Sequence, residues 1–90
     1  MVSAPYEVEF RPEGISDLDH LASDVRDRIV DRVRWLASNF DDITPEPLRG
    51  KQWRGVLKLR VGDYRILYTA NRRLHLLPTH LVGHRREIYR

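Results

Sequence analysis

The chain contains no cysteine, only five glycines and five prolines, and no apolar run approaching the roughly 18 residues of a membrane helix. The lack of cysteine excludes a small secreted scaffold held together by disulfides. No basic segment followed by an apolar stretch opens the sequence, so we expect neither a signal peptide nor a membrane partner. We therefore expect a soluble cytoplasmic protein, and 90 residues suggest one domain, residues 1–90, with a small core.

The motifs of several enzyme classes are also missing. The sequence has no glycine-rich phosphate loop and no nucleophile elbow. Its histidines at 75, 80 and 84 are spaced by 5 and 4 residues within an expected strand, which matches no helical pair of metal ligands. We therefore expect neither a metal nor another cofactor.

Charge is distributed unevenly along the chain. Residues 1–45 hold five arginines and ten acidic residues, a balance of −5. Residues 46–90 hold eleven basic and three acidic residues, a balance of +8, so the net charge of +3 hides a strong asymmetry. A basic half of this kind indicates a polyanion or an acidic protein as partner.

The N-terminal part predicts one strand followed by two helices. Apolar and charged residues alternate over Tyr6–Phe10, the period of a half-buried strand, which Pro12 and Gly14 should end. Ser16 is expected to cap a short helix over Asp17–Leu21.

Ser23 is expected to cap a longer helix, which gives way to a loop over Asn39–Pro47. Its apolar residues recur every three or four positions and should form one buried stripe. Trp35, inside this helix, is expected to pack. The stripe consists of Val25, Ile29, Val33, Leu36 and Phe40.

The C-terminal half predicts a β-hairpin whose two-residue turn is Gly62-Asp63. This register places Lys58, Arg60 and Arg65 on one open face, because side chains alternate along a strand. Like charges opposite each other destabilise a sheet, so these cations should serve to bind something negative. The expected pairs are Val61 with Tyr64, Leu59 with Ile66, Leu57 with Tyr68, Arg60 with Arg65, and Lys58 with Leu67.

A third C-terminal strand is expected over roughly Leu74–Val82, where Pro78 predicts either an edge position or a bulge. The element order is then β-α-α-β-β-β. This order predicts an α+β fold in which a short helical pair packs on a mostly antiparallel sheet.

The element order and three segments, Pro47–Gly50, Leu59–Tyr68 and Gly83–Tyr89, resemble the RelE/ParE superfamily of bacterial toxins, and most closely its RelE-type members. The resemblance implies a ribosome-dependent, metal-independent endoribonuclease that cleaves mRNA in the A site. It also implies a cognate acidic, RelB-like antitoxin as partner, beside the ribosome and mRNA. The alternative is a ParE-like toxin, which inhibits DNA gyrase by binding and is no nuclease.

By position, the resemblance implies catalytic roles for Lys58, Arg65 and Arg85, and for Tyr89 near the C-terminus. Val56 stands where the best-known members carry a further lysine. A guanidinium stays charged and can hold two phosphate oxygens, so arginine suits stabilisation of a phosphorane.

His84 is a further catalytic candidate, because an imidazole with a pKa near 6.5 can donate or accept a proton at neutral pH. Each of these assignments has an alternative. His84 could be a solvated loop residue, Tyr89 could pack at the C-terminus, and Arg65 could pair with Asp63 or Glu87.

Other cations are expected to bind the RNA backbone. They would extend the electrostatic surface of the catalytic residues and make binding sensitive to salt. Trp53 could stack on a nucleotide, although a tryptophan entering a strand more often lies at the edge of a core. The expected RNA-binding residues are Arg60, Arg86, Arg49, Lys51 and Arg54.

Overall fold

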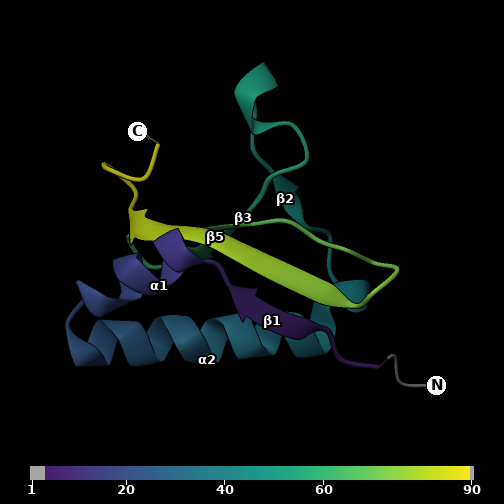
Figure 1. Ribbon diagram of the computed structural model, residues 1–90, viewed down its shortest axis with the longest axis horizontal. Helices are drawn as coiled ribbons and strands as arrows, with labels where there is room; N and C mark the ends of the chain where they lie inside the picture. The colour runs from purple at the N-terminus through teal and green to yellow at the C-terminus, as the bar shows by residue number, and fades with distance from the viewer. Residues whose placement is uncertain (1–3, 90) are drawn as a thin grey trace.

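The chain forms a five-stranded sheet with two α-helices on one face, and Figure 1 shows both helices on the same side of the strands. The computed structural model describes residues 4–89. The strands lie in the order β1-β5-β4-β3-β2, with β1 parallel to β5 and the other neighbours antiparallel. The elements are β1 (Glu7–Phe10), α1 (Pro12–Asp19), α2 (Ser23–Asn39), β2 (Glu46–Pro47), β3 (Leu57–Val61), β4 (Tyr64–Tyr68) and β5 (Leu76–His84), with the 3₁₀ turns η1 (Phe40–Asp42) and η2 (Lys51–Trp53).

The expected α+β class is confirmed, but α1 begins earlier than expected. The sequence suggested a helix over 17–21 capped by Ser16, whereas α1 starts at Pro12, with Arg11 at the capping position. Proline suits this first turn because the N–H that it lacks would have no partner inside the helix. The second helix begins at Ser23 with Ala22 as its cap, one residue from the expected boundary.

The third expected C-terminal strand, β5, lies inside the sheet between β1 and β4, so the edge alternative for Pro78 is wrong. The bulge alternative is confirmed: Leu67 pairs with Leu81 and Tyr68 with Thr79, which leaves His80 as an extra residue. Pro78 contributes its carbonyl, which accepts a hydrogen bond from the Thr69 N–H at 3.0 Å, so its missing N–H is not needed there.

The β3–β4 hairpin has the expected register, from Val61 opposite Tyr64 to Leu57 opposite Tyr68. Gly62 has φ = 57°, the left-handed conformation that a two-residue hairpin turn requires and glycine adopts without strain. Two short segments were missed, because the expected loop over 39–47 contains η1 and the two-residue strand β2.

The stripe on α2 is buried as expected: Ile29, Val33, Leu36 and Phe40 are almost completely inaccessible, and Val25 packs against the same core. The expectation that Trp35 packs is wrong, since 40% of this residue is exposed and the Arg32 guanidinium lies 4.0 Å from its ring centre. Leu36, the next residue, occupies the stripe, which turns Trp35 outward. Within residues 4–89, no helix is long and apolar enough to span a membrane.

Gly14 in α1 packs directly on the backbone of β5. A Cβ atom added at this position would lie 2.9 Å from the Thr79 carbonyl oxygen and 3.4 Å from that of His80. Helix propensity favours alanine over glycine by about 1 kcal/mol, but backbone atoms of a central strand cannot easily move. We therefore expect Gly14→Ala to lower the free energy of unfolding by about 1–3 kcal/mol in urea denaturation.

Ser16→Ala is the matched control for this prediction, since Ser16 lies on the exposed side of the same helix. It should change the free energy of unfolding by less than about 0.5 kcal/mol. A Gly14→Ala protein as stable as the Ser16→Ala protein would show that α1 can move away from β5 at little cost.

Candidate functional site

The face of the sheet that the helices leave open carries the cations expected there. The β3–β4 register places Lys58, Arg60 and Arg65 on this face, with Arg60 directly opposite Arg65. At the edge of the sheet, Glu46 of β2 pairs with Lys58 and therefore lies on the same face. The open face thus combines three cations with one carboxylate.

A cleft of about 520 Å³ opens on this face between the β2–β3 edge and the end of the chain. The loop from β2 to β3 forms one wall, because the Leu48 N–H donates to the Val56 carbonyl at 2.9 Å and closes the loop at its base. Figure 1 shows this loop projecting away from the helices. We call this hollow the basic cleft; its lining residues are Glu46, Pro47, Leu48, Arg49, Trp53, Lys58, Arg60 and Tyr89.

Glu46 and Arg60 form a fork-to-fork ion pair in the basic cleft. The Arg60 Nε donates to both carboxylate oxygens, at 3.0 and 3.2 Å, and Nη2 donates to Oε2 at 3.0 Å. The Lys58 Nζ lies 3.6 Å from the same Oε2. The hydrogen bonds from Arg60 lower the pKa of the Glu46 carboxyl, with burial opposing them and Lys58 adding to them. Glu46 is therefore ionised at neutral pH.

Two aromatic side chains line the basic cleft, Trp53 from the loop between β2 and β3 and Tyr89 from the end of the chain. The rings of Trp53 and Tyr89 meet edge to face, with their centres 6.4 Å apart. Tyr89 is 44% exposed, while the neighbouring Ile88 is buried and anchors the segment against Gly83. Tyr89 therefore borders the cleft at the surface while its ring packs on Trp53, and Ile88 is the residue of this segment that enters the core.

Arg65 is the buried member of the cation group, with only 9% of the residue exposed. Its Nη1 donates to the carbonyls of Gly62 and Tyr64, both at 2.8 Å. Both hydrogen bonds go to backbone carbonyls, so they differ from the alternative pairing of Arg65 with Asp63 or Glu87. Asp63 instead lies 3.8 Å from the Arg85 Nε, and Arg85 is half exposed at the hairpin turn.

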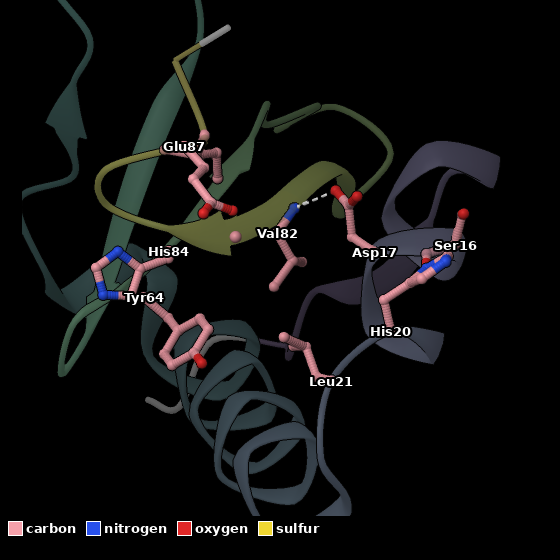
Figure 2. A pocket seen from close by; sticks show the side chains of 10 residues that line it. Ser16, Asp17, His20, Leu21, Tyr64, Val82, His84 and Glu87 are labelled. Carbon is pink, nitrogen blue, oxygen red and sulfur yellow. Dashed lines mark hydrogen bonds between the residues drawn. The ribbon is translucent and has the colours of Figure 1, made fainter.

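His84 lies on the other side of the sheet. It pairs with Tyr64 across β4 and β5, and the two rings meet at 5.7 Å on the side that faces the helices. Figure 2 shows His84 and Tyr64 at one end of a second pocket, of about 540 Å³, with His20 at the other end. Between them the Asp17 carboxylate accepts a hydrogen bond from the Val82 N–H at 2.8 Å. The structure therefore separates His84 from the basic cleft.

A family model describing the ParE toxin of type II toxin–antitoxin systems, parDE, matches residues 8–89. The chain belongs to this family. It is thus a toxin of a type II toxin–antitoxin system and a member of the RelE/ParE superfamily, as the sequence indicated. Among curated protein sequences, no significant match was found.

Solved structures of related toxins have the same fold. The toxin–antitoxin complex RelBE2 from Mycobacterium tuberculosis is 26% identical with a TM-score of 0.79, and the match covers 89% of this chain and 91% of that one. The RelB–RelE complex from Methanococcus jannaschii is 26% identical with a TM-score of 0.65, covering 89% and 93%. The isolated E. coli RelE toxin is 20% identical with a TM-score of 0.72, covering 88% and 83%, and this likeness concerns the fold alone.

The other cations expected to bind RNA lie around the basic cleft and beyond the end of β5. Arg49 lines the cleft, while Lys51 and Arg54 lie exposed in and beside η2 on the projecting loop. Arg86 is exposed beyond β5, where its backbone N–H donates to the His84 Nδ1. Of the five expected RNA-binding residues, Arg49 and Arg60 therefore share the cleft with Lys58 and Tyr89.

Glu46 is the residue of the cleft that the sequence did not reveal. It lies in a two-residue strand, which is too short to produce any periodic pattern. One signal was available: Glu46 is one of three acidic residues in a half of the chain that holds eleven basic ones. Its pairing with Lys58 becomes visible only when β2 is placed beside β3.

Proposed function

We propose that this toxin is a ribosome-dependent, metal-independent endoribonuclease that cleaves mRNA in the ribosomal A site and so inhibits translation. The observation that carries this proposal is the basic cleft. It combines cations that can neutralise a phosphate, a carboxylate that can accept a proton and an exposed aromatic ring that can contact a base. A protein that only binds a partner does not need an ionised carboxylate among its phosphate-binding groups.

Cleavage without a metal requires a base for the 2′-hydroxyl, positive charge at the phosphorane and an acid for the departing 5′-oxygen. In this proposal Lys58 and Arg60 supply charge inside the cleft, and the Glu46 carboxylate, which is ionised at neutral pH, accepts the proton. Arg65 and Arg85 add positive charge at the hairpin end of the same surface. Preorganised charges of this kind are typically worth a factor of about 10²–10³ in rate.

His84 remains a candidate for the acid, but it does not share the cleft with the other groups. Lys58 and Tyr89 are the proton donors that line the cleft itself. Lys58 lies inside the cleft with a side chain that is only 20% exposed, whereas Tyr89 borders it at the surface.

Tyr89 is proposed to stack on a base of the bound strand. Stacking on an aromatic side chain contributes roughly 1–3 kcal/mol per base, so we expect Tyr89→Ala to weaken binding of a short single-stranded RNA by about tenfold in fluorescence anisotropy. Trp35→Ala is the control, since Trp35 is similarly exposed but lies on α2. Equal affinities for both variants would place the bound strand away from Tyr89.

We also propose that a cognate antitoxin holds the toxin inactive. The M. tuberculosis and M. jannaschii relatives were solved as complexes with their RelB antitoxins. An acidic antitoxin would complement the basic half of this chain and compete directly with RNA for the cleft. Co-expression with the product of a neighbouring gene should yield a stable complex in size-exclusion chromatography, and added antitoxin should stop cleavage.

The deciding experiment is incubation of the purified toxin with programmed ribosomes, followed by primer extension to map new 5′ ends in the mRNA. Cuts confined to the codon in the A site, and absent when ribosomes are omitted, would support the proposal. Folded toxin that leaves the mRNA intact would overturn it.

The second candidate function is inhibition of DNA gyrase by binding, and the family description favours it because it names the ParE toxin of parDE. A supercoiling assay with purified gyrase, run on the same toxin preparation, separates the two candidates. Inhibition of supercoiling with intact mRNA would identify a gyrase poison.

A further inference from the structure

The Glu46 carboxylate occupies the donor groups of Arg60 that would otherwise be available to a ligand. Three contacts of 3.0–3.2 Å join the two forks, and the Lys58 Nζ approaches the same carboxylate to 3.6 Å. A phosphate presents two oxygens with a similar spacing, and arginine binds carboxylates and phosphates in this same two-point geometry. In its negative charge and its two acceptor oxygens, the Glu46 carboxylate therefore resembles a nucleic-acid phosphate.

The ion pair is accessible to a competing anion. The Arg60 side chain is 59% exposed and that of Glu46 is 38% exposed, so water reaches both partners. Exposed ion pairs contribute little to stability, because solvent screens them and two long side chains must be held in place. Displacement of Glu46 from Arg60 by a phosphate therefore costs little free energy.

We infer that the Glu46 carboxylate marks a phosphate subsite of the basic cleft and that a phosphate of the bound RNA displaces it from Arg60. This inference rests on the proposed function, and it identifies Arg60 as the residue that holds the phosphate at two points. The Lys58 Nζ, 3.6 Å from the same carboxylate, contributes a second positive charge to this subsite. In the free toxin Glu46 keeps the subsite filled and reduces the attraction of the cleft for unrelated polyanions.

The exchange also changes the chemistry of Glu46. The hydrogen bonds from Arg60 are the largest cause of the lowered pKa of this carboxyl. Once Arg60 turns to the phosphate, these bonds are lost and the carboxylate becomes a stronger base. Glu46 thus gains its ability to accept a proton when the strand is in place.

The inference is tested with Glu46→Gln, which keeps the shape of the side chain and removes its charge. The probe is a fluorescein-labelled single-stranded RNA of about ten nucleotides, measured by anisotropy over a range of salt concentrations without ribosomes. We expect Glu46→Gln to bind about fivefold more tightly at low salt, because Arg60 is no longer occupied. The slope of log K against log salt should steepen by about 0.7, the value for one additional phosphate contact on a single strand.

Glu9→Gln is the matched control, because Glu9 pairs with Arg11 at 2.9 Å on the opposite edge strand and its loss changes the net charge equally. It should tighten binding by less than about twofold. The gain from Glu46→Gln should disappear in an Arg60→Ala background, since the two effects then share one site. Equal gains for the two glutamine variants, or a gain that persists without Arg60, would overturn the inference.

The two proposals can fail separately. If the wild-type toxin cuts mRNA on ribosomes while Glu46→Gln binds RNA no more tightly, the phosphate subsite is wrong and the nuclease stands. If the wild-type toxin neither binds the RNA nor cuts on ribosomes, and Glu46→Gln does no better, both proposals are wrong.

Discussion

Lys58→Met is expected to reduce the rate of mRNA cleavage on programmed ribosomes by about 10²–10³ while leaving the toxin folded. The Lys58 side chain is 20% exposed on the floor of the basic cleft, and its Nζ lies 3.6 Å from Glu46. Methionine preserves the apolar stem that packs on the sheet and removes the ammonium group. The carboxylate keeps its three contacts with Arg60, so the substitution leaves no unpaired charge behind.

Lys51→Met is the control for this prediction. It removes the same charge from the projecting loop, at an exposed position in η2. We expect it to weaken cleavage only slightly, through the loss of long-range attraction, and this effect should fade as salt is raised. The measurement is the single-turnover rate at saturating toxin, with circular dichroism to verify folding. Comparable rates for the two variants would exclude a role for Lys58 at the reacting phosphate.

Local patterns were sufficient to predict the hairpin and the buried face of α2. Gly62-Asp63 fixes the register of β3 against β4, and alternation then decides which side chains lie on the open face. The same reasoning placed the start of α1 too late: the strand does end before Pro12, but Pro12 is also the first residue of the helix. Proline suits both the end of a strand and the first turn of a helix, so the residue alone does not reveal where α1 begins.

The basic cleft could be predicted only in part, because its residues come from segments far apart in the sequence. The hairpin register predicts that Lys58 and Arg60 lie on one face, whereas Glu46 belongs to a strand too short to recognise in the sequence. Tyr89 reaches the cleft because the chain turns back after β5, where Ile88 packs on Gly83. None of these tertiary contacts leaves a periodic signal in the sequence.

His84 illustrates how one irregularity changes a functional assignment. Its side of the sheet depends on counting residues along β5, and the bulge at His80 adds one residue to that count. From the sequence, Pro78 indicated an edge position or a bulge, but not where the extra residue would fall. The position of His84 beside Tyr64 is therefore a consequence of that single extra residue.

Arg65→Met is expected to lower the free energy of unfolding by about 2–4 kcal/mol, an effect on stability rather than on chemistry alone. The Arg65 guanidinium is nearly buried, and its Nη1 donates to the Gly62 and Tyr64 carbonyls at 2.8 Å each. Hydrogen bonds from a charged donor contribute more than neutral ones, and their loss leaves two backbone acceptors at the hairpin turn without this partner. Urea denaturation followed by circular dichroism measures the change.

Arg60→Met is the matched control, since Arg60 lies directly opposite Arg65 in the register but has a side chain that is 59% exposed. Its removal should cost less than about 1 kcal/mol, as is usual for an exposed ion pair. Similar losses for the two variants would mean that the Arg65 hydrogen bonds contribute little to the fold.

The two roles suggested for Arg65 can be separated with Arg65→Lys. An ammonium keeps the positive charge but lacks the planar fork that reaches two carbonyls while presenting further N–H groups. If Arg65 acts mainly by holding the hairpin turn, Arg65→Lys should lower the free energy of unfolding almost as much as Arg65→Met. Cleavage by both variants should then recover when the assay temperature is lowered well below their unfolding midpoints. If Arg65 also stabilises the phosphorane, cleavage by Arg65→Met should stay low at every temperature at which the toxin is folded. The temperature dependence of cleavage therefore distinguishes an arginine that positions the hairpin from one that contacts the RNA.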